Sequence, residues 1–285
     1  MLYRTSPLYV ARVWGSLELE GRRDPIGEVW WVHDGEEGSS ELMDTLGGTC
    51  RVADLVSAGM LPGEVSFPVL LKTLHTADRL SVQVHPGIEG GSLYKEETWL
   101  VLEAGPGAWM MGGVRTADRD EFARAAMDGE AARLLSRIPL RENDVYHIPP
   151  GTVHSLGPGL RILEVQSNCD VTYRLYDWGR VDAAGRSRDL HLEKGLGSVD
   201  WSAPGKPVRV RRGADGRLEL EAGYSITVLA GRRRVQVPPG GIFFLRSGAV
   251  NLECTLDAPL CLMADSGGGS FSLDGSGYLI ETEGI

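Results

Sequence analysis

The heptapeptide LSVQVHP, Leu80–Pro86, alternates polar and apolar side chains. This pattern is typical of a short β-strand, in which alternate side chains share one face. Ser81, Gln83 and His85 therefore point one way, and the valines between them point the other way. A polar face on an apolar strand either meets solvent or lines a cavity that holds a ligand. The spacing alone leaves both interpretations open, because glutamine is an uncommon metal ligand.

A second stretch, NDVYHIPPGTVH at Asn143–His154, predicts a strand, a tight turn and the start of another strand. The Pro-Pro-Gly sequence fixes the turn, so His154 has a defined orientation. Glu97 stands at the entry to another apolar strand, after the glycine-rich loop Pro86–Ser92. We expect a hairpin to bring Glu97 beside His85. Each residue alone is usually a solvated charge or a surface histidine, but their order along the chain favours a common site.

Short apolar runs bounded by Gly, Pro, Asp or Asn recur along the rest of the chain. Together with 38 glycines and 15 prolines, they predict a mainly β fold of many short strands, not the strand–helix alternation of a Rossmann fold. The predicted strands are Phe67–Leu71, Ser81–Val84, Trp99–Leu102, Asp144–Ile148, Arg161–Val165, Ser225–Leu229, Ile242–Leu245 and Leu260–Ala264.

Helical patterns are a minority and lie in the N-terminal part. Ala117–Ser136 is rich in Ala, Arg and Glu, with a break expected at Gly129, and a shorter helix is expected at Val52–Ala58. Ser198–Val208 contains two prolines and a glycine and is interpreted as a connector. We therefore expect two β-rich domains, residues 1–200 and 201–285.

The composition is that of a soluble globular protein: of 285 residues, 42% are hydrophobic and 24% charged. There is neither an apolar run long enough to cross a bilayer nor a signal-peptide pattern at the N-terminus. The four cysteines form no CxxC pair, which favours reduced thiols over disulfides or a zinc knuckle. We expect a cytoplasmic protein that does not bind membranes.

The formal net charge of −10 argues against a nucleic-acid partner, because phosphate backbones require a broad basic face. It does not exclude a small phosphorylated substrate. Salt screens surface charges within about 10 Å, so a few local cations can outweigh the global charge.

Several stretches of the chain resemble the type I phosphomannose isomerase family of the cupin superfamily. The matching segments are Tyr9–Gly15, Gly27–Trp30, Leu71–Lys72, Leu80–Pro86, Lys95–Trp99, Ile148–Gly159, Leu163–Arg180 and Arg188–Lys194. The most specific are the GTVH turn and LEVQSNCDVTYRLYDWGR, which ends at Arg180. The resemblance implies two cupin-type (jelly-roll) β-barrels, the first catalytic. In the second, the turn Val237–Gly240 is followed by no histidine, so we expect no metal site there.

The family resemblance also implies an activity and a set of site residues. The expected reaction interconverts mannose 6-phosphate and fructose 6-phosphate with the help of one zinc ion. The implied metal ligands are Gln83, His85, Glu97 and His154. The implied catalytic residues are Arg180, Lys95 and Lys72, and Ser81 and Arg180 are expected to bind the substrate.

Two imidazoles, a carboxylate and an amide suit Zn²⁺, although Mn²⁺, Fe²⁺, Co²⁺ or Ni²⁺ would also be accepted. The general base stays open between the lysines and Glu164.

Two other functions remain open at this stage. A metal-containing cupin could bind a sugar or sugar phosphate without turning it over, and loss of Arg180 or the lysines would favour this reading. A cupin oxygenase would bind Fe²⁺ and consume oxygen, but the glutamine ligand makes it less attractive.

Overall fold

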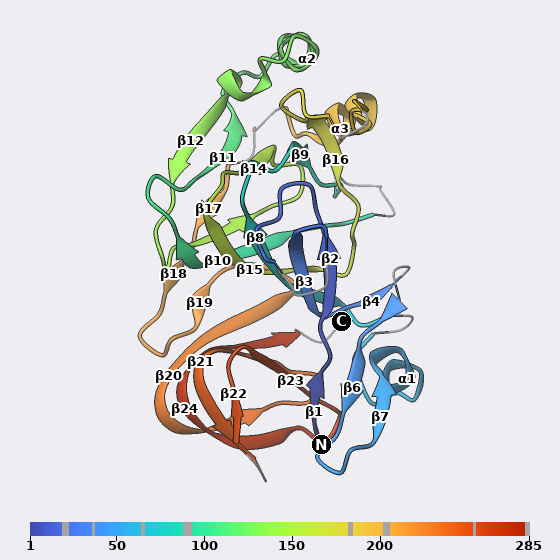
Figure 1. Ribbon diagram of the computed structural model, residues 1–285, viewed down its shortest axis with the longest axis vertical. Helices are drawn as coiled ribbons and strands as arrows, with labels where there is room; N and C mark the ends of the chain where they lie inside the picture. The colour runs from blue at the N-terminus through green and yellow to red at the C-terminus, as the bar shows by residue number, and fades with distance from the viewer. Residues whose placement is uncertain are drawn as a thin grey trace. The chain divides into compact units, whose positions relative to one another are not determined.

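The computed structural model (Figure 1) describes residues 1–18, 23–35, 38–63, 66–87, 93–181, 185–201, 206–252 and 255–282. Strands dominate, which confirms the mainly β prediction. The described helices are short: α1 (Val52–Ser57), α2 (Arg119–Met127), α3 (Leu192–Ser198) and the 3-10 helix η1 (Ala131–Leu134). None of them is long and apolar enough to cross a membrane.

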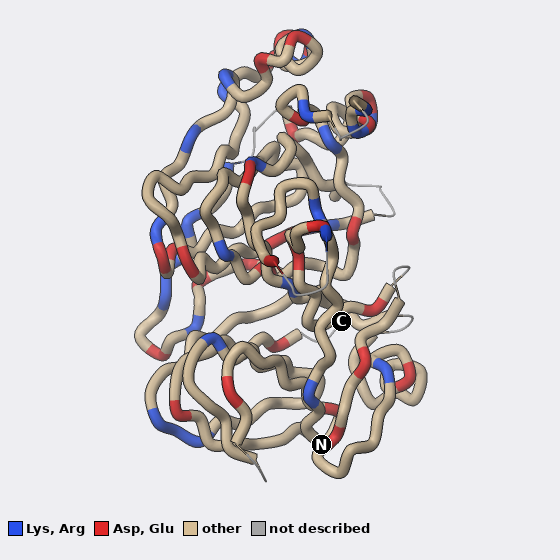
Figure 2. Tube along the Cα trace, in the orientation of Figure 1, with Lys and Arg blue, Asp and Glu red and all other residues tan. Residues whose placement is uncertain are grey.

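The chain forms two compact units that alternate along the sequence. The first unit contains Met1–Tyr9, Val29–Lys72 and Val210–Ile285, and the second contains Val10–Glu28 and Thr73–Arg209. The division into residues 1–200 and 201–285 stays a prediction. Figure 2 shows acidic and basic residues interspersed along the described chain of each unit.

The first unit is built on an eight-stranded sheet of order β20-β24-β21-β23-β1-β6-β7, with β22 paired to β21. Two long strands, β20 and β24, pair along their whole length (Figure 1). The core of this unit includes Phe243, Leu262 and Leu273, all almost fully buried. The strands are β1 (Leu2–Thr5), β6 (Glu41–Met43), β7 (Thr49–Arg51), β20 (Tyr224–Val237), β21 (Ile242–Asn251), β22 (Thr255–Asp257), β23 (Leu260–Ala264) and β24 (Gly269–Thr282). Two small hairpins add β4 (Asp34–Gly35) with β5 (Gly38–Ser39) and β18 (Arg211–Arg212) with β19 (Leu218–Glu219).

The second unit contains a five-stranded sheet, β12-β11-β14-β9-β16, and most of a seven-stranded sheet, β17-β13-β10-β15-β8-β3-β2. The strands of the first are β9 (Val82–Val84), β11 (Trp109–Val114), β12 (Leu135–Pro139), β14 (His154–Leu156) and β16 (Tyr173–Tyr176). Those of the second are β2 (Leu8–Ala11), β3 (Ile26–Val32), β8 (Val69–Thr76), β10 (Glu97–Ala104), β13 (Val145–Ile148), β15 (Leu160–Ser167) and β17 (Val208–Arg209).

The five-stranded sheet is largely buried along its inner strands β11, β14 and β9, whereas its edge strand β12 exposes Arg137 and Pro139. Toward the other sheet, Met110 and Leu156 pack with Trp99 and Ile162 in one apolar cluster. On its opposite face, the valines of β9 join a second cluster with residues of α2 and α3, such as Phe122. The side chains of β9 that alternate with these valines therefore point toward the seven-stranded sheet. This layering, not a solvent-exposed face, explains the polar residue of β9, Gln83, and the polar residues Ser81 and His85 that flank the strand.

Each predicted strand overlaps a strand of the structure, but the strands predicted at Ser225–Leu229 and Ile242–Leu245 were too short and extend to Val237 and Asn251. The predicted helix Ala117–Ser136 was too long. Its N-cap is Asp118, whose Oδ1 accepts hydrogen bonds from the backbone N–H groups of Asp120 and Glu121. The expected break at Gly129 is confirmed by its φ of 79°, after which the chain forms η1 and then β12.

Several predictions fall partly outside the described residues. These are residues 88–92 of the loop Pro86–Ser92, the centre of the connector Ser198–Val208, and Cys254. The sequence did not predict α3, which precedes that connector. The other cysteines, Cys50, Cys169 and Cys261, are free thiols as expected.

Candidate active site

Three predicted metal ligands meet between the two sheets of the second unit. His85 follows β9, Glu97 opens β10 and His154 opens β14. His154 and Gln83 are direct neighbours across the β14–β9 pair. The predicted hairpin between the strands of His85 and Glu97 was wrong, because β9 pairs with β14 and β16 while β10 pairs with β13 and β15. Glu97 approaches His85 from the opposite sheet.

The three side chains form a compact, fully buried triad. Nε2 of His85 lies 2.9 Å from Oε1 of Glu97, and Nε2 of His154 lies 3.8 Å from Oε2. One ligand atom from each residue falls within 4.8 Å of the others. None of the three side chains is more than 2% exposed.

Backbone carbonyls set the orientation of both imidazoles. Nδ1 of His85 lies 3.0 Å from the carbonyl oxygen of Val171, and Nδ1 of His154 lies 2.8 Å from that of Thr152. A carbonyl can only accept, so each Nδ1 carries the proton and each Nε2 presents a lone pair toward Glu97.

This arrangement fits a metal ion. Nε2 of His85 and Oε2 of Glu97 are buried and have no hydrogen-bond partner among the described residues, although Nε2 of His85 is close to the other carboxylate oxygen. Lone pairs that face a carboxylate at this distance repel each other unless a cation lies between them. Buried polar atoms without partners are rare and costly, and a bound cation would satisfy both.

The protonation states also suit metal binding. Burial lowers the pKa of His154 to about 4, with a further contribution from His85, and burial lowers the pKa of His85 as well. Both rings are therefore neutral near pH 7. Burial alone would raise the pKa of Glu97, but His85 and Lys95 outweigh it and hold that pKa well below its usual range. The triad thus presents two neutral imidazoles and one carboxylate.

Gln83 extends the triad on the β9 side. Its Nε2 lies 3.3 Å from Nε2 of His154, and its Oε1 accepts a 3.1 Å hydrogen bond from Ser81 Oγ. A half-turn of the amide would present Oε1 to the same point that the imidazoles face. The prediction that Ser81, Gln83 and His85 share a face agrees with the contact between Ser81 and Gln83.

The predicted catalytic lysines lie in different surroundings. Lys95 is buried at 1% exposure, and its Nζ lies 3.0 Å from Oε1 of Glu97. Lys72, on β8, is also buried, and its Nζ lies 5.9 Å from the ring centroid of Trp30. Lys95 therefore contacts the triad directly, whereas Lys72 is assigned to the first unit.

Arg180 is held by acidic side chains and a carbonyl. Its Nη1 donates to Asp177 at 3.1 Å, and its Nη2 donates to Asp78 at 3.0 Å and to the carbonyl of Arg79 at 2.6 Å. Two of these bonds hold Arg180 against Asp78 and Arg79, which precede β9. Asp177 also forms an ion pair with Arg188, whose Nη2 lies 2.6 Å from Oδ1 of Asp177.

Sequence reasoning missed several residues of this region. Trp99 follows Glu97 on the same face of β10, and its ring centroid lies 5.3 Å from that of His154. Gln166 lies directly opposite Glu97 in the β10–β15 register and is fully buried. The alternation of β10 could have revealed Trp99, but the carbonyl acceptors of Val171 and Thr152 have no side-chain pattern to reveal them.

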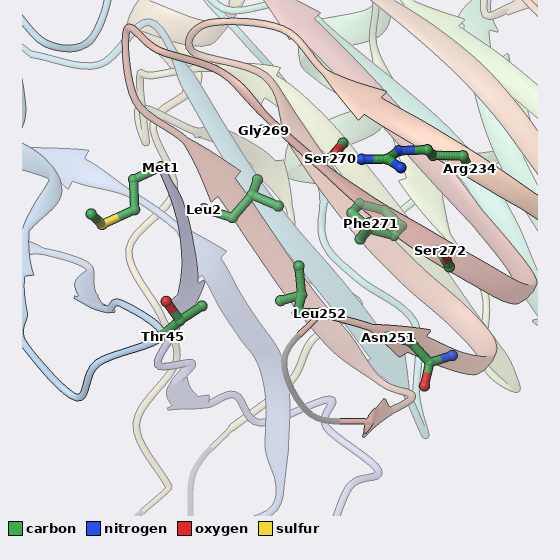
Figure 3. Close-up of a pocket in the computed structure, with 10 residues that line it drawn as sticks. All are labelled: Met1, Leu2, Thr45, Arg234, Asn251, Leu252, Gly269, Ser270, Phe271 and Ser272. Atoms are coloured by element: carbon green, nitrogen blue, oxygen red, sulfur yellow. Dashed lines mark hydrogen bonds between the residues drawn. The ribbon is translucent and has the colours of Figure 1, made fainter.

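A separate pocket of about 420 Å³ lies in the first unit (Figure 3). Its lining contains no His, Asp or Glu and none of the predicted site residues. The lining residues are Met1, Leu2, Thr45, Arg234, Asn251, Leu252, Gly269, Ser270, Phe271 and Ser272.

Comparison with known proteins finds relatives by sequence and by fold. No family model matches the chain. Mannose-6-phosphate isomerase ManA of Bacillus subtilis (strain 168) is 33% identical over 210 residues, which cover 68% of this chain and 66% of that protein. The chain belongs to the phosphomannose isomerase family. Slightly less than two thirds of the length of this relative is therefore matched by sequence.

Solved phosphomannose isomerases share the fold over the whole chain. The crystal structure of the Bacillus subtilis mannose 6-phosphate isomerase matches with a TM-score of 0.82 and 23% identity, covering 99% of both chains. A zinc-bound mannose 6-phosphate isomerase matches with a TM-score of 0.72 and 14% identity, again over 99% of both chains. At this level of identity, the likeness establishes the fold.

Proposed function

We propose that the protein is a metal-dependent isomerase that interconverts mannose 6-phosphate and fructose 6-phosphate. The observation that carries the proposal is the buried triad His85, Glu97 and His154, in which lone pairs converge on one point. Family membership supplies the substrate class. The alternative, a metal-containing protein that binds sugar phosphates without turnover, is an outcome of the test below.

The metal would be zinc, held by the triad with Gln83 as a fourth ligand after its amide turns. The donor set, without a thiolate, is typical of catalytic and not structural zinc sites. The zinc-bound relative supports this choice. When bound, the ion acts as a Lewis acid that polarises substrate oxygens and stabilises the charge of an enediol-like transition state.

The protein side chains hold the substrate and move protons. Isomerisation moves one proton between C1 and C2 of the sugar and one between the oxygens on these two carbons, so the molecule as a whole is neither oxidised nor reduced. Lys95 Nζ donates to Oε1 of Glu97 and keeps that carboxylate ionised while it serves as a ligand. Lys95 and Lys72 are the proposed proton carriers, or they bind substrate hydroxyls.

Arg180 and Ser81 are the proposed substrate-binding residues. The Nε of Arg180 and one Nη1 hydrogen have no bond among the described residues, so they are available to phosphate or hydroxyl oxygens. Ser81 Oγ, which now donates to Gln83, would be released when the amide turns.

The finer architecture is also a proposal. We propose that the layered sheets of the two units are cupin-type jelly-roll barrels, and that only the barrel with the triad holds a metal. The family fold supports this reading.

The test is an isomerase assay on purified protein. Zinc-loaded protein is expected to convert mannose 6-phosphate to fructose 6-phosphate, chelation to abolish the activity, and zinc to restore it. Mannose without the phosphate is the control substrate. Full activity after complete removal of metal would contradict the metal mechanism. Thermal stabilisation by mannose 6-phosphate without any conversion would favour the binding protein instead.

A further inference from the structure

The loop after β15 carries a contact that orients the triad. This loop, Ser167–Val171, ends in the carbonyl that fixes Nδ1 of His85 at 3.0 Å. Its start is tied to the strand of Glu97, because Ser167 N–H donates to the carbonyl of Glu96 at 3.1 Å. The shape of the loop therefore decides where His85 can direct its Nε2.

Gln166 holds the middle of this loop. Its Nε2 donates to the carbonyl of Cys169 at 2.8 Å and to that of Ser167 at 3.1 Å. The side chain is fully buried on β15, directly opposite Glu97. The amide thus links the strand that faces the triad to the loop that orients His85.

The carbonyl oxygen of the Gln166 amide lowers the stability of the fold. Oε1 of Gln166 is buried and has no hydrogen-bond partner among the described residues. Leaving a buried acceptor unsatisfied lowers stability, and an apolar side chain of similar size would avoid that cost. Stability of the fold alone does not account for a glutamine here, whereas its two loop contacts give it a role in placing His85.

We propose that Gln166 is a positioning residue for the metal: it fixes the Ser167–Val171 loop so that Val171 directs His85 Nε2 toward the ion. This inference rests on the metal site of the proposed function. Outer partners that orient metal ligands typically change metal affinity about 10- to 100-fold when removed. We expect a loss of this size when the amide is removed, without loss of folding stability.

The experiment compares Gln166→Met with Thr76→Val. Methionine has a similar length and no hydrogen bonds to give, and it also removes the unsatisfied oxygen. Thr76 is a matched control, because its buried Oγ1 donates to the carbonyl of Gly157 at 2.9 Å in the same unit. Zinc affinity is measured by competition with a chelator, and unfolding of the metal-free proteins by urea.

We expect Gln166→Met to unfold at the wild-type urea concentration or higher and to bind zinc at least tenfold more weakly. Thr76→Val is expected to unfold earlier and to bind zinc normally. The visible spectrum of the Co²⁺-loaded protein gives a second measurement, which changes only if the ligand geometry changes. We expect a changed spectrum for Gln166→Met alone. Gln166→Leu serves as a second variant if the methionine variant does not fold.

Two results would overturn the inference, and they differ in meaning. If wild-type protein binds zinc and isomerises the sugar phosphate but Gln166→Met binds zinc within twofold of it with the same Co²⁺ spectrum, only the role of Gln166 is wrong. If the wild-type protein itself binds no zinc, the metal site and this inference both fall.

Discussion

At the scale of residues, the triad is linked by charge to a lysine outside it. Lys95 and Glu97 form an ion pair in which both side chains are 1% exposed. Charges that are removed from water are stable only when they are paired. Metal binding requires the carboxylate of Glu97, and folding requires that the same carboxylate neutralise the buried ammonium of Lys95. The pair therefore couples metal binding to folding.

The first prediction concerns this pair. Glu97→Gln leaves the ammonium of Lys95 buried without its counter-ion, so the metal-free protein should lose about 3 kcal/mol of unfolding free energy. The double variant Lys95→Met, Glu97→Gln should recover most of that loss but bind no zinc. Urea unfolding and chelator competition measure the two effects. A single variant as stable as wild type would show that the pair is not coupled.

The second prediction concerns Arg180. Lysine cannot make the forked contacts of Arg180 to Asp177 and Asp78 together with the carbonyl of Arg79. We expect Arg180→Lys to reduce kcat/KM more than tenfold, about 1.4 kcal/mol of transition-state stabilisation. Arg188→Lys is the matched control, since Arg188 also binds Asp177 but has no assigned site role. Equal losses in both variants would argue that the effect passes through Asp177 alone.

At the scale of elements, the sequence correctly predicted which strand face carries the site residues. It did not predict which strands pair. Alternation placed Gln83 and His85 on one face, and the prolines before Gly151 correctly indicated the turn before His154. The partner of β9 could not be predicted, because its pairing with β14 joins Gln83 to His154 across a long stretch of chain. The alternation of polar and apolar residues shows which side chains of a strand share a face. Which strand pairs with it depends on how the two sheets pack.

Other details depend on tertiary contacts that leave no local pattern. The burial of Lys95 could not be predicted, because a lysine beside glutamates is typical of a surface. Gln166 was missed because its contacts are backbone carbonyls of a loop.

The third prediction concerns the turn that precedes His154. Gly151 has a φ of 74°, and a Cβ there would lie 3.0 Å from the carbonyl oxygen of Ser198. Gly107 has a φ of 75° with open space around it, so it isolates the backbone strain. Alanine at either site should cost about 1–2 kcal/mol of stability. Only Gly151→Ala should also weaken zinc binding, as measured by chelator competition, because it displaces the turn before His154. Unchanged zinc affinity would mean that the turn tolerates the shift.

At the scale of the whole molecule, buried and partly buried histidines make stability depend on pH. Burial, with a smaller contribution from Arg161, lowers the pKa of His75 to about 4, and the pKa of His154 is likewise about 4. An unfolded histidine titrates near 6.5. Between these values the unfolded chain binds more protons than the folded chain, so stability falls as pH drops from about 6.5 toward 4.

The fourth prediction isolates this effect outside the triad. The stabilising contribution of neutral His75 should be fully present above pH 6.5 and should decrease on acidification. His75→Gln removes its titration, so the urea midpoint of the metal-free variant should fall less between pH 7 and pH 5 than that of wild type. Parallel midpoints across this range would contradict the depressed pKa of His75.

The carbonyl contacts of Thr152 and Val171 have a consequence for the heat of metal uptake. They hold both imidazoles in the tautomer that a metal needs, and Glu97 is already ionised, so no ligand has to release a proton near pH 7. The calorimetric enthalpy of zinc binding should therefore be the same in buffers with very different ionisation enthalpies.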